Sequence, residues 1–150
     1  MFRLASLYGA CFALAACSTG GVVDCEAARP VASEGWARES LTAQAMGAAY
    51  FRLSNQGDCP AVLTGASSPL AASVGLHESR EENGVARMRP VERVEIAPGR
   101  NIDFAPGGLH LMLSGLERSL AAGEQLPVML SFEDGPDLEL TISIEEAGAR

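Results

Sequence analysis

The feature that most constrains the fold is the close spacing of turn signals between short apolar stretches. Beyond residue 30, clusters of Gly, Pro, Asn and Asp interrupt the chain at residues 55–58, 82–84, 97–99, 106–108 and 134–137. Such clusters break helices and favour tight turns. Short strands joined by frequent turns are typical of a β-sandwich or barrel, so the sequence predicts an all-β fold.

Two expected strands near the C-terminus show a clear alternation of side chains. Residues 138–145 alternate between apolar and polar side chains, and residues 128–132 do the same. A period of two places the apolar side chains on one face of a strand and the polar ones on the other. The chain has 150 residues, 47% of them hydrophobic, which suits one globular domain. We expect a single β-sandwich domain over residues 25–150.

The N-terminal residues differ in composition from this domain. Arg3 is followed by an uncharged, mostly apolar stretch that ends at Ala16. It is too short for a stable membrane-spanning helix and is typical of a secretory signal peptide. Leu14-Ala15-Ala16-Cys17 resembles the lipobox of bacterial lipoproteins. This resemblance implies a signal peptide over residues 1–16, lipid attachment to Cys17, and a flexible tether over residues 17–24. The alternative is an ordinary signal peptide that contains a cysteine.

An exported chain of this kind matures in an oxidising compartment. Lipidation at Cys17 implies a periplasm-facing protein anchored in the bacterial cell envelope, and by resemblance Ser18 favours the outer membrane over the inner one. Cys11 leaves with the signal, so Cys25 and Cys59 remain as thiols. An even pair in such a compartment predicts a disulfide, which would stabilise the fold by ~3–4 kcal/mol on the chain-entropy account. Two separate buried thiols are the alternative.

The charge of the chain bears on its partners. It carries 19 Asp and Glu against 11 basic residues, all of them Arg, and its net charge is −8. Because an acidic chain repels phosphate groups, we expect no nucleic-acid partner.

One expected strand carries a histidine and a methionine on an unusual face. In the segment Leu109-His110-Leu111-Met112-Leu113 the three leucines share one face. His110 and Met112 therefore share the opposite face, about 7 Å apart along the strand. A methionine of the core would lie with the leucines, so this pairing with a histidine calls for a functional explanation.

The second histidine has a methionine within reach through a turn. His77 follows Leu76 in a stretch where Val74 and Leu76 share one face, so His77 points to the other. A hairpin turn at residues 82–84 would bring Met88 back toward His77. Taken singly, Met88 could fill the core and each histidine could be an ordinary surface residue. The joint arrangement of all four residues is what favours a site.

Two imidazoles and two thioethers form an uncharged nitrogen–sulfur donor set. Thioether sulfur favours Cu(I), and imidazole also binds copper, whereas zinc prefers thiolate, imidazole or carboxylate. Free thiols in an oxidising compartment tend to form disulfides, but a thioether has no proton to lose and forms none. The sequence therefore predicts a Cu(I) site made by His77, Met88, His110 and Met112.

The same four residues carry a family resemblance. Their spacing, His77-x10-Met88-x21-His110-x-Met112, resembles the signature of the periplasmic PCuAC copper chaperones, and similarity extends from about Trp36 to Ile144. The resemblance implies a cupredoxin-like Greek-key β-sandwich that binds one Cu(I) through these side chains. It also implies delivery of copper to the copper A centre in cytochrome c oxidase subunit II, alongside a Sco-type thiol protein. Many members have a methionine directly after the first histidine, where this chain has Glu78.

Two other classes of function remain open at the level of sequence. An enzyme would need a catalytic motif, but the chain has neither G-x-S-x-G nor H-E-x-x-H, and Cys25 and Cys59 lack the spacing of a redox motif. We expect that the protein is not an enzyme. A structural or interaction lipoprotein that binds no metal would explain the lipobox and the β-fold, but it leaves the two histidines and two methionines as a coincidence.

Overall fold

The computed structural model describes residues 25–40, 42 and 46–150. The signal peptide, Cys17 and the tether lie outside these residues. The described part contains ten strands: β1 (Pro30–Arg38), β2 (Gly47–Asn55), β3 (Ala61–Ser67), β4 (Ala71–Glu82), β5 (Val85–Pro90), β6 (Val94–Ile96), β7 (Asn101–Phe104), β8 (Leu109–Leu116), β9 (Gln125–Phe132) and β10 (Leu138–Glu145). Within it, no helix is long and apolar enough to cross a bilayer. The all-β prediction is confirmed.

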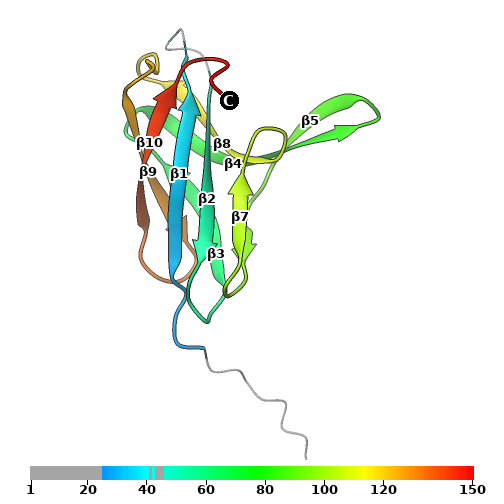
Figure 1. Cartoon of the computed structure of the whole chain (residues 1–150), viewed down its shortest axis with the longest axis vertical. Helices are drawn as coiled ribbons and strands as arrows, with labels where there is room; N and C mark the ends of the chain where they lie inside the picture. The colour runs from blue at the N-terminus through cyan, green and yellow to red at the C-terminus, as the bar shows by residue number, and fades with distance from the viewer. Residues whose placement is uncertain (1–24, 41, 43–45) are drawn as a thin grey trace, which may run out of the picture.

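The strands form one sheet that closes on itself. Its order is β5-β4-β8-β2-β1-β10-β9-β3-β6, and a pairing between β3 and β4 at Ala66 and Val74 joins the two sides. The β1–β10 pair is parallel, whereas every other pair in this order is antiparallel. Strand β7 pairs with the second half of β2, where β8 has already diverged. The result is a flattened barrel (Figure 1).

The alternation expected from the sequence decides which side chains fill the barrel. On β10 the residues Leu140, Ile142 and Ile144 are buried, while the intervening residues 141 and 143 are exposed. Strand β9 shows the same pattern, with Val128 and Leu130 buried. Burying a Leu, Ile or Val side chain contributes about 1.5–3 kcal/mol, so this interior is the main source of stability.

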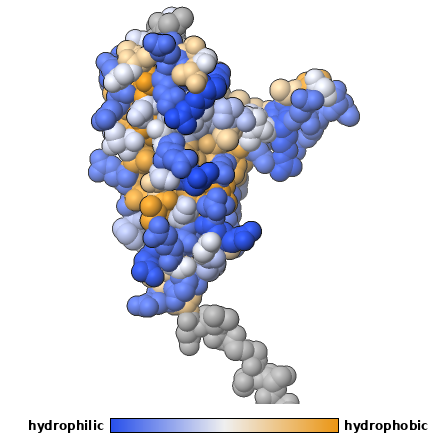
Figure 2. All heavy atoms as spheres, viewed as in Figure 1, coloured by the Kyte–Doolittle hydropathy of each residue, from blue (hydrophilic) through white to orange (hydrophobic). Residues whose placement is uncertain are grey.

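Strand β5 is the exception to this packing. The β4–β5 hairpin projects from the barrel as an arm (Figure 1), and all six residues of β5 are exposed. We call residues 78–90 the arm. Hydrophilic residues predominate on its visible side (Figure 2), and its exposed large apolar side chains are Val85 and Met88. A two-stranded hairpin that packs on nothing else is only marginally stable in water. The arm therefore depends for its order on the rest of β4, which is paired within the barrel.

The segment before β1 is fastened to the turn between β2 and β3. The predicted disulfide between Cys25 and Cys59 is present, with a sequence separation of 34 residues. Next to it, the Asp58 carboxylate accepts hydrogen bonds from the backbone N–H groups of Glu26 and Ala27, at 3.0 and 2.9 Å respectively. These hydrogen bonds lower the pKa of Asp58, that from residue 27 most strongly. A Cβ at Gly57 would lie 2.1 Å from a backbone oxygen of this segment, so only glycine allows such a close approach.

Candidate metal centre

The two histidines face each other across neighbouring strands. His77 on β4 and His110 on β8 are register partners, and their ring centroids are 6.0 Å apart. The adjacent pair, Leu76 and Leu111, is buried in the core. Because successive side chains of a strand point to opposite faces, the imidazoles lie on the outer face of the barrel wall. The sequence prediction placed both rings on this face.

The register brings both methionines of the predicted set to the same face. Met112 is opposite Gly75, two residues from His77 along β4. Met88 is opposite Ser79, two residues from His77 in the other direction. Such diagonal neighbours have Cβ atoms about 7–8 Å apart, within reach of long side chains. The four residues thus share one face over β5, β4 and β8, while their role as metal ligands stays a prediction.

His110 is oriented by a hydrogen bond that its ring donates to the backbone just before its own strand. It is 4% exposed, and its Nδ1 lies 3.0 Å from the carbonyl oxygen of Gly108. A carbonyl oxygen only accepts, so Nδ1 carries the proton and the lone pair of Nε2 is left for a ligand. The same Gly108 oxygen accepts a hydrogen bond from the Ser79 backbone N–H at 3.0 Å. This carbonyl therefore holds β4, β8 and the imidazole in one arrangement, as a supporting group does for a metal-binding histidine.

His77 has the opposite property. Its Nδ1 is buried, and no hydrogen-bond partner for it exists among the described residues. Burial lowers the pKa of His77 below its ordinary value of 6.5, and the neighbouring His110 lowers it further. The ring therefore stays neutral to a lower pH than a solvated histidine would. A neutral imidazole with a buried, unpaired nitrogen is costly as it stands but suits a metal ion, so the donor set fits copper.

A row of aromatic rings continues from the histidines across the outer face. Tyr50 on β2 lies beside His110, with 6.3 Å between ring centroids, and Trp36 on β1 lies beside Tyr50 at 4.5 Å. The Arg150 guanidinium lies 5.5 Å from the Trp36 ring. The Tyr50 ring is thus the aromatic neighbour of His110 on the side away from His77. Tyr50 was not among the residues predicted from the sequence. Its neighbours Ala49 and Phe51 belong to the core cluster and Tyr50 does not, so on a strand its ring lies on the other face.

The arm beside the histidines balances its own charges. Glu82 pairs with both Arg87 and Arg89, at 3.4 and 2.7 Å, and Glu78 pairs with Arg80 at 2.9 Å. All are surface pairs, each worth about 0–1 kcal/mol. They flank Met88 without covering it, since Met88 is 50% exposed.

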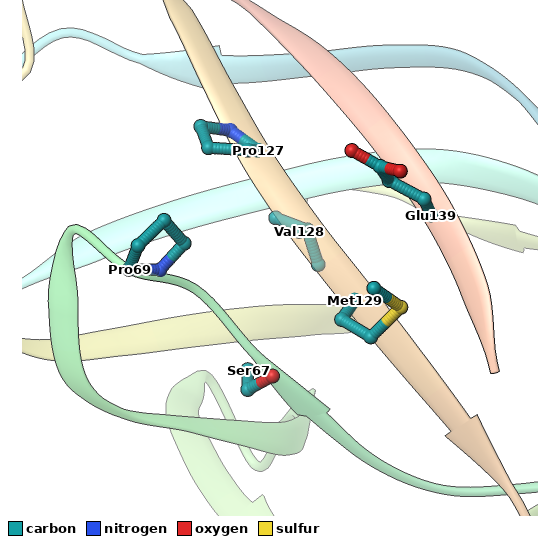
Figure 3. Close-up of a pocket in the computed structure, with 6 residues that line it drawn as sticks. All are labelled: Ser67, Pro69, Pro127, Val128, Met129 and Glu139. Carbon is teal, nitrogen blue, oxygen red and sulfur yellow. The ribbon is translucent and has the colours of Figure 1, made fainter.

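The rest of the described chain offers no competing metal centre. In the described part of the chain, no three His, Cys, Asp or Glu residues are grouped so that they could hold a metal ion. An apolar depression lies on another part of the barrel, where Pro127, Val128 and Met129 of β9 meet Ser67, Pro69 and Glu139 (Figure 3). It contains no histidine, and Glu139 is its one ionisable residue.

Fold and site together define a cupredoxin-like β-barrel domain with a histidine–methionine face. The family described as "Putative lipoprotein LpqE-like" matches residues 31–144. The chain belongs to this LpqE-like family. "Putative lipoprotein Lxx21020" of Leifsonia xyli subsp. xyli is 33% identical over 115 residues, covering 76% of this chain and 68% of that protein. "Uncharacterized protein RP573" of Rickettsia prowazekii is 27% identical, and the match covers 73% of this chain and 62% of that protein.

Solved structures support the same fold. The copper-bound PCuAC domain from PmoF2 has a TM-score of 0.65 and 20% identity, and the match covers 82% of this chain and 98% of that one. The solution structure of CuI-DR1885 from Deinococcus radiodurans has a TM-score of 0.52 and 29% identity, covering 75% of this chain and 77% of that one. The resemblance to PCuAC proteins and the predicted cupredoxin-like fold are confirmed.

Proposed function

We propose that this protein is a Cu(I)-binding metallochaperone of the bacterial cell envelope and that it is not an enzyme. His77, Met88, His110 and Met112 hold one Cu(I) as cargo. The observation that carries the proposal is the buried, unpartnered Nδ1 of His77 on a face that it shares with the other three side chains. The fold it shares with a copper-bound PCuAC domain, and its 29% identity to CuI-DR1885, support the same assignment.

The donor set suits a carrier that must also release its metal. Thioether and imidazole are neutral, and sulfur of this type favours Cu(I). An acceptor with thiolate ligands binds Cu(I) more strongly and can take the ion by stepwise ligand exchange without a change of oxidation state. His77, His110 and Met112 lie on strands of the closed barrel, whereas Met88 lies on the exposed arm. Met88 is therefore the first ligand that an approaching acceptor would replace.

The acceptor that we propose is the copper A centre of cytochrome c oxidase subunit II, with a Sco-type thiol protein as a further partner. The location that we propose is the periplasmic side of the envelope, with an anchor through Cys17 for which we favour the outer over the inner membrane. The Cys25–Cys59 disulfide lies at the β2–β3 end of the barrel, away from the arm (Figure 1). A tether over residues 17–24 reaches at most roughly 26–29 Å. Anchoring at that end would leave the arm at the part of the domain farther from the anchoring membrane (Figure 1).

A competition titration against a Cu(I) chelator tests the site. We expect one Cu(I) per chain in the wild type and sharply weaker binding in His110→Ala and in Met112→Ala, while circular dichroism shows that the β-fold survives. Met129→Leu is the matched control, because Met129 is a partly exposed methionine on β9, outside this face. Wild-type affinity in the two site variants would refute the assignment.

Two cellular measurements separate delivery from a structural role. Elemental analysis of protein matured in the cell envelope should find copper, and its absence would favour a lipoprotein that binds no metal. A deletion strain grown under copper limitation should lose oxidase activity if copper delivery is the main role. Unchanged oxidase activity would contradict the proposal that cytochrome c oxidase is the acceptor, but it would not contradict the proposed copper site.

A further inference from the structure

A third methionine lies beside the face that holds the predicted ligands. Met46 directly precedes β2 and is 65% exposed, the largest value among the exposed large hydrophobic residues of the described chain. Its direction follows from Gly47, where an added Cβ would lie 3.2 Å from Leu120 and 3.5 Å from Leu113. Gly47 therefore faces the core, and its neighbour Met46 faces outward.

The register of β2 and β8 places Met46 close to Met112. Gly47 is opposite Leu113, and Ala48 is opposite Met112. This register ends at Gly47, where β2 begins; continued by one pair, it would set Met46 opposite Ser114 and make it a diagonal neighbour of Met112. Cβ atoms in such positions are about 7–8 Å apart, which two methionine side chains can bridge.

The cross-strand neighbours of Met112 are small residues. Its cross-strand partners are Ala48 on one side and Gly75 on the other, and neither has a side chain long enough to separate Met112 from Met46. Met112 itself is only partly buried. Across the face from β5 to β2, the order of donors is Met88, His77, His110 with Met112, and then Met46. An exposed thioether thus lies at each end of the histidine pair.

We propose that Met46 is a transient Cu(I) ligand which, together with Met112, forms an outer binding position next to the main site. This inference rests on the proposed function. Copper moves between the two positions as Cu(I): a bond to the Met46 sulfur forms as a bond to a histidine of the main site breaks, and Met112 stays bound throughout. Because every donor is neutral, the move needs no proton and no electron. It gives the cargo a second route of exchange, on the same face but beyond the histidine pair from the arm.

Methyl NMR of the protein as cells produce it provides a direct test. The sequence contains five methionines, so labelling their methyl groups with 13C gives a small set of resonances, each assigned with a Met→Leu variant. Cu(I) is added without oxygen, up to one equivalent. We expect it to shift the Met88 and Met112 methyl resonances, and to broaden that of Met46 because the bound ion exchanges between the two positions. The Met129 resonance, from an exposed methionine outside this face, should stay in place.

The outcomes separate this inference from the function on which it rests. If Met88 and Met112 shift while Met46 behaves like Met129, the outer position is wrong and the main site stands. If neither the Met88 nor the Met112 resonance responds to Cu(I), the proposed main site is wrong, and the outer position that depends on it is wrong as well. In Met46→Leu, which keeps the apolar shape and removes the sulfur, the shift of Met112 by Cu(I) should persist, and the broadening that exchange between the two positions gives the Met112 resonance should be lost. Broadening of Met112 that survives in this variant would overturn the proposal.

Discussion

Replacement of Gly75 by alanine should damage the site without damaging the fold. Gly75 lies on β4 opposite Met112, and its missing side chain leaves room for the His77 ring. A Cβ at this position would lie 3.0 Å from His77 Nε2 and 3.2 Å from its Cδ2. Both contacts are tighter than ordinary van der Waals distances, so the imidazole must turn away from its present position.

The size of the effect follows from that rotation. Forcing a side chain about 30° from its rotamer costs about 0.5–1.5 kcal/mol, which corresponds to a Kd for Cu(I) weaker by about two- to twelve-fold. The fold should not lose stability, because alanine reduces the entropy of the unfolded chain and gains about 0.4–1 kcal/mol where its backbone conformation is unstrained. The φ of Gly75 is not among the positive values of this chain.

Two measurements on the same sample check both halves of this prediction. Chelator competition gives the Cu(I) affinity, and urea denaturation of the copper-free protein gives the free energy of unfolding. The control is Gly65→Ala on β3, where no atom lies within 4 Å of an added Cβ and the affinity should be unchanged. Wild-type affinity in Gly75→Ala, or an equal loss in Gly65→Ala, would show that the position of the His77 ring does not govern binding.

The remaining predictions concern the end of the barrel that holds the disulfide. Replacing both Cys25 and Cys59 by serine should lower the free energy of unfolding by ~3–4 kcal/mol in urea denaturation, and a loss below about 1 kcal/mol would contradict the loop-closure account. The Asp58 carboxyl has a lowered pKa in the folded protein, so its stabilising contribution is complete above its ordinary pKa of 3.8 and disappears as pH falls through the lowered value. Asp58→Asn should therefore flatten the stability profile in that acidic range, and a profile identical to that of the wild type would refute the role of its hydrogen bonds.

Local patterns were enough to predict the strands and the faces of most of their side chains. The alternation on β8 and β10 depends only on the pleat, which has a period of two whatever the strand pairs with. For that reason, the outward direction of His77, His110 and Met112 could be inferred from neighbouring leucines. The hairpin turn at residues 82–84 is likewise local, and it correctly brought Met88 back along β4. The disulfide followed from the number of cysteines and the expected compartment.

Only the tertiary structure determined which strands lie next to each other. No local pattern indicates that β4 and β8, separated by more than 25 residues, meet with His77 opposite His110, because that register depends on the packing of the whole barrel. The same holds for the Tyr50 ring beside His110, for the unpaired Nδ1 of His77, and for Gly75 beneath the imidazole. The sequence by itself determined which donors are available and which way they point. Only the closed sheet determined that they meet, because convergence of residues far apart in the chain is a property of strand pairing.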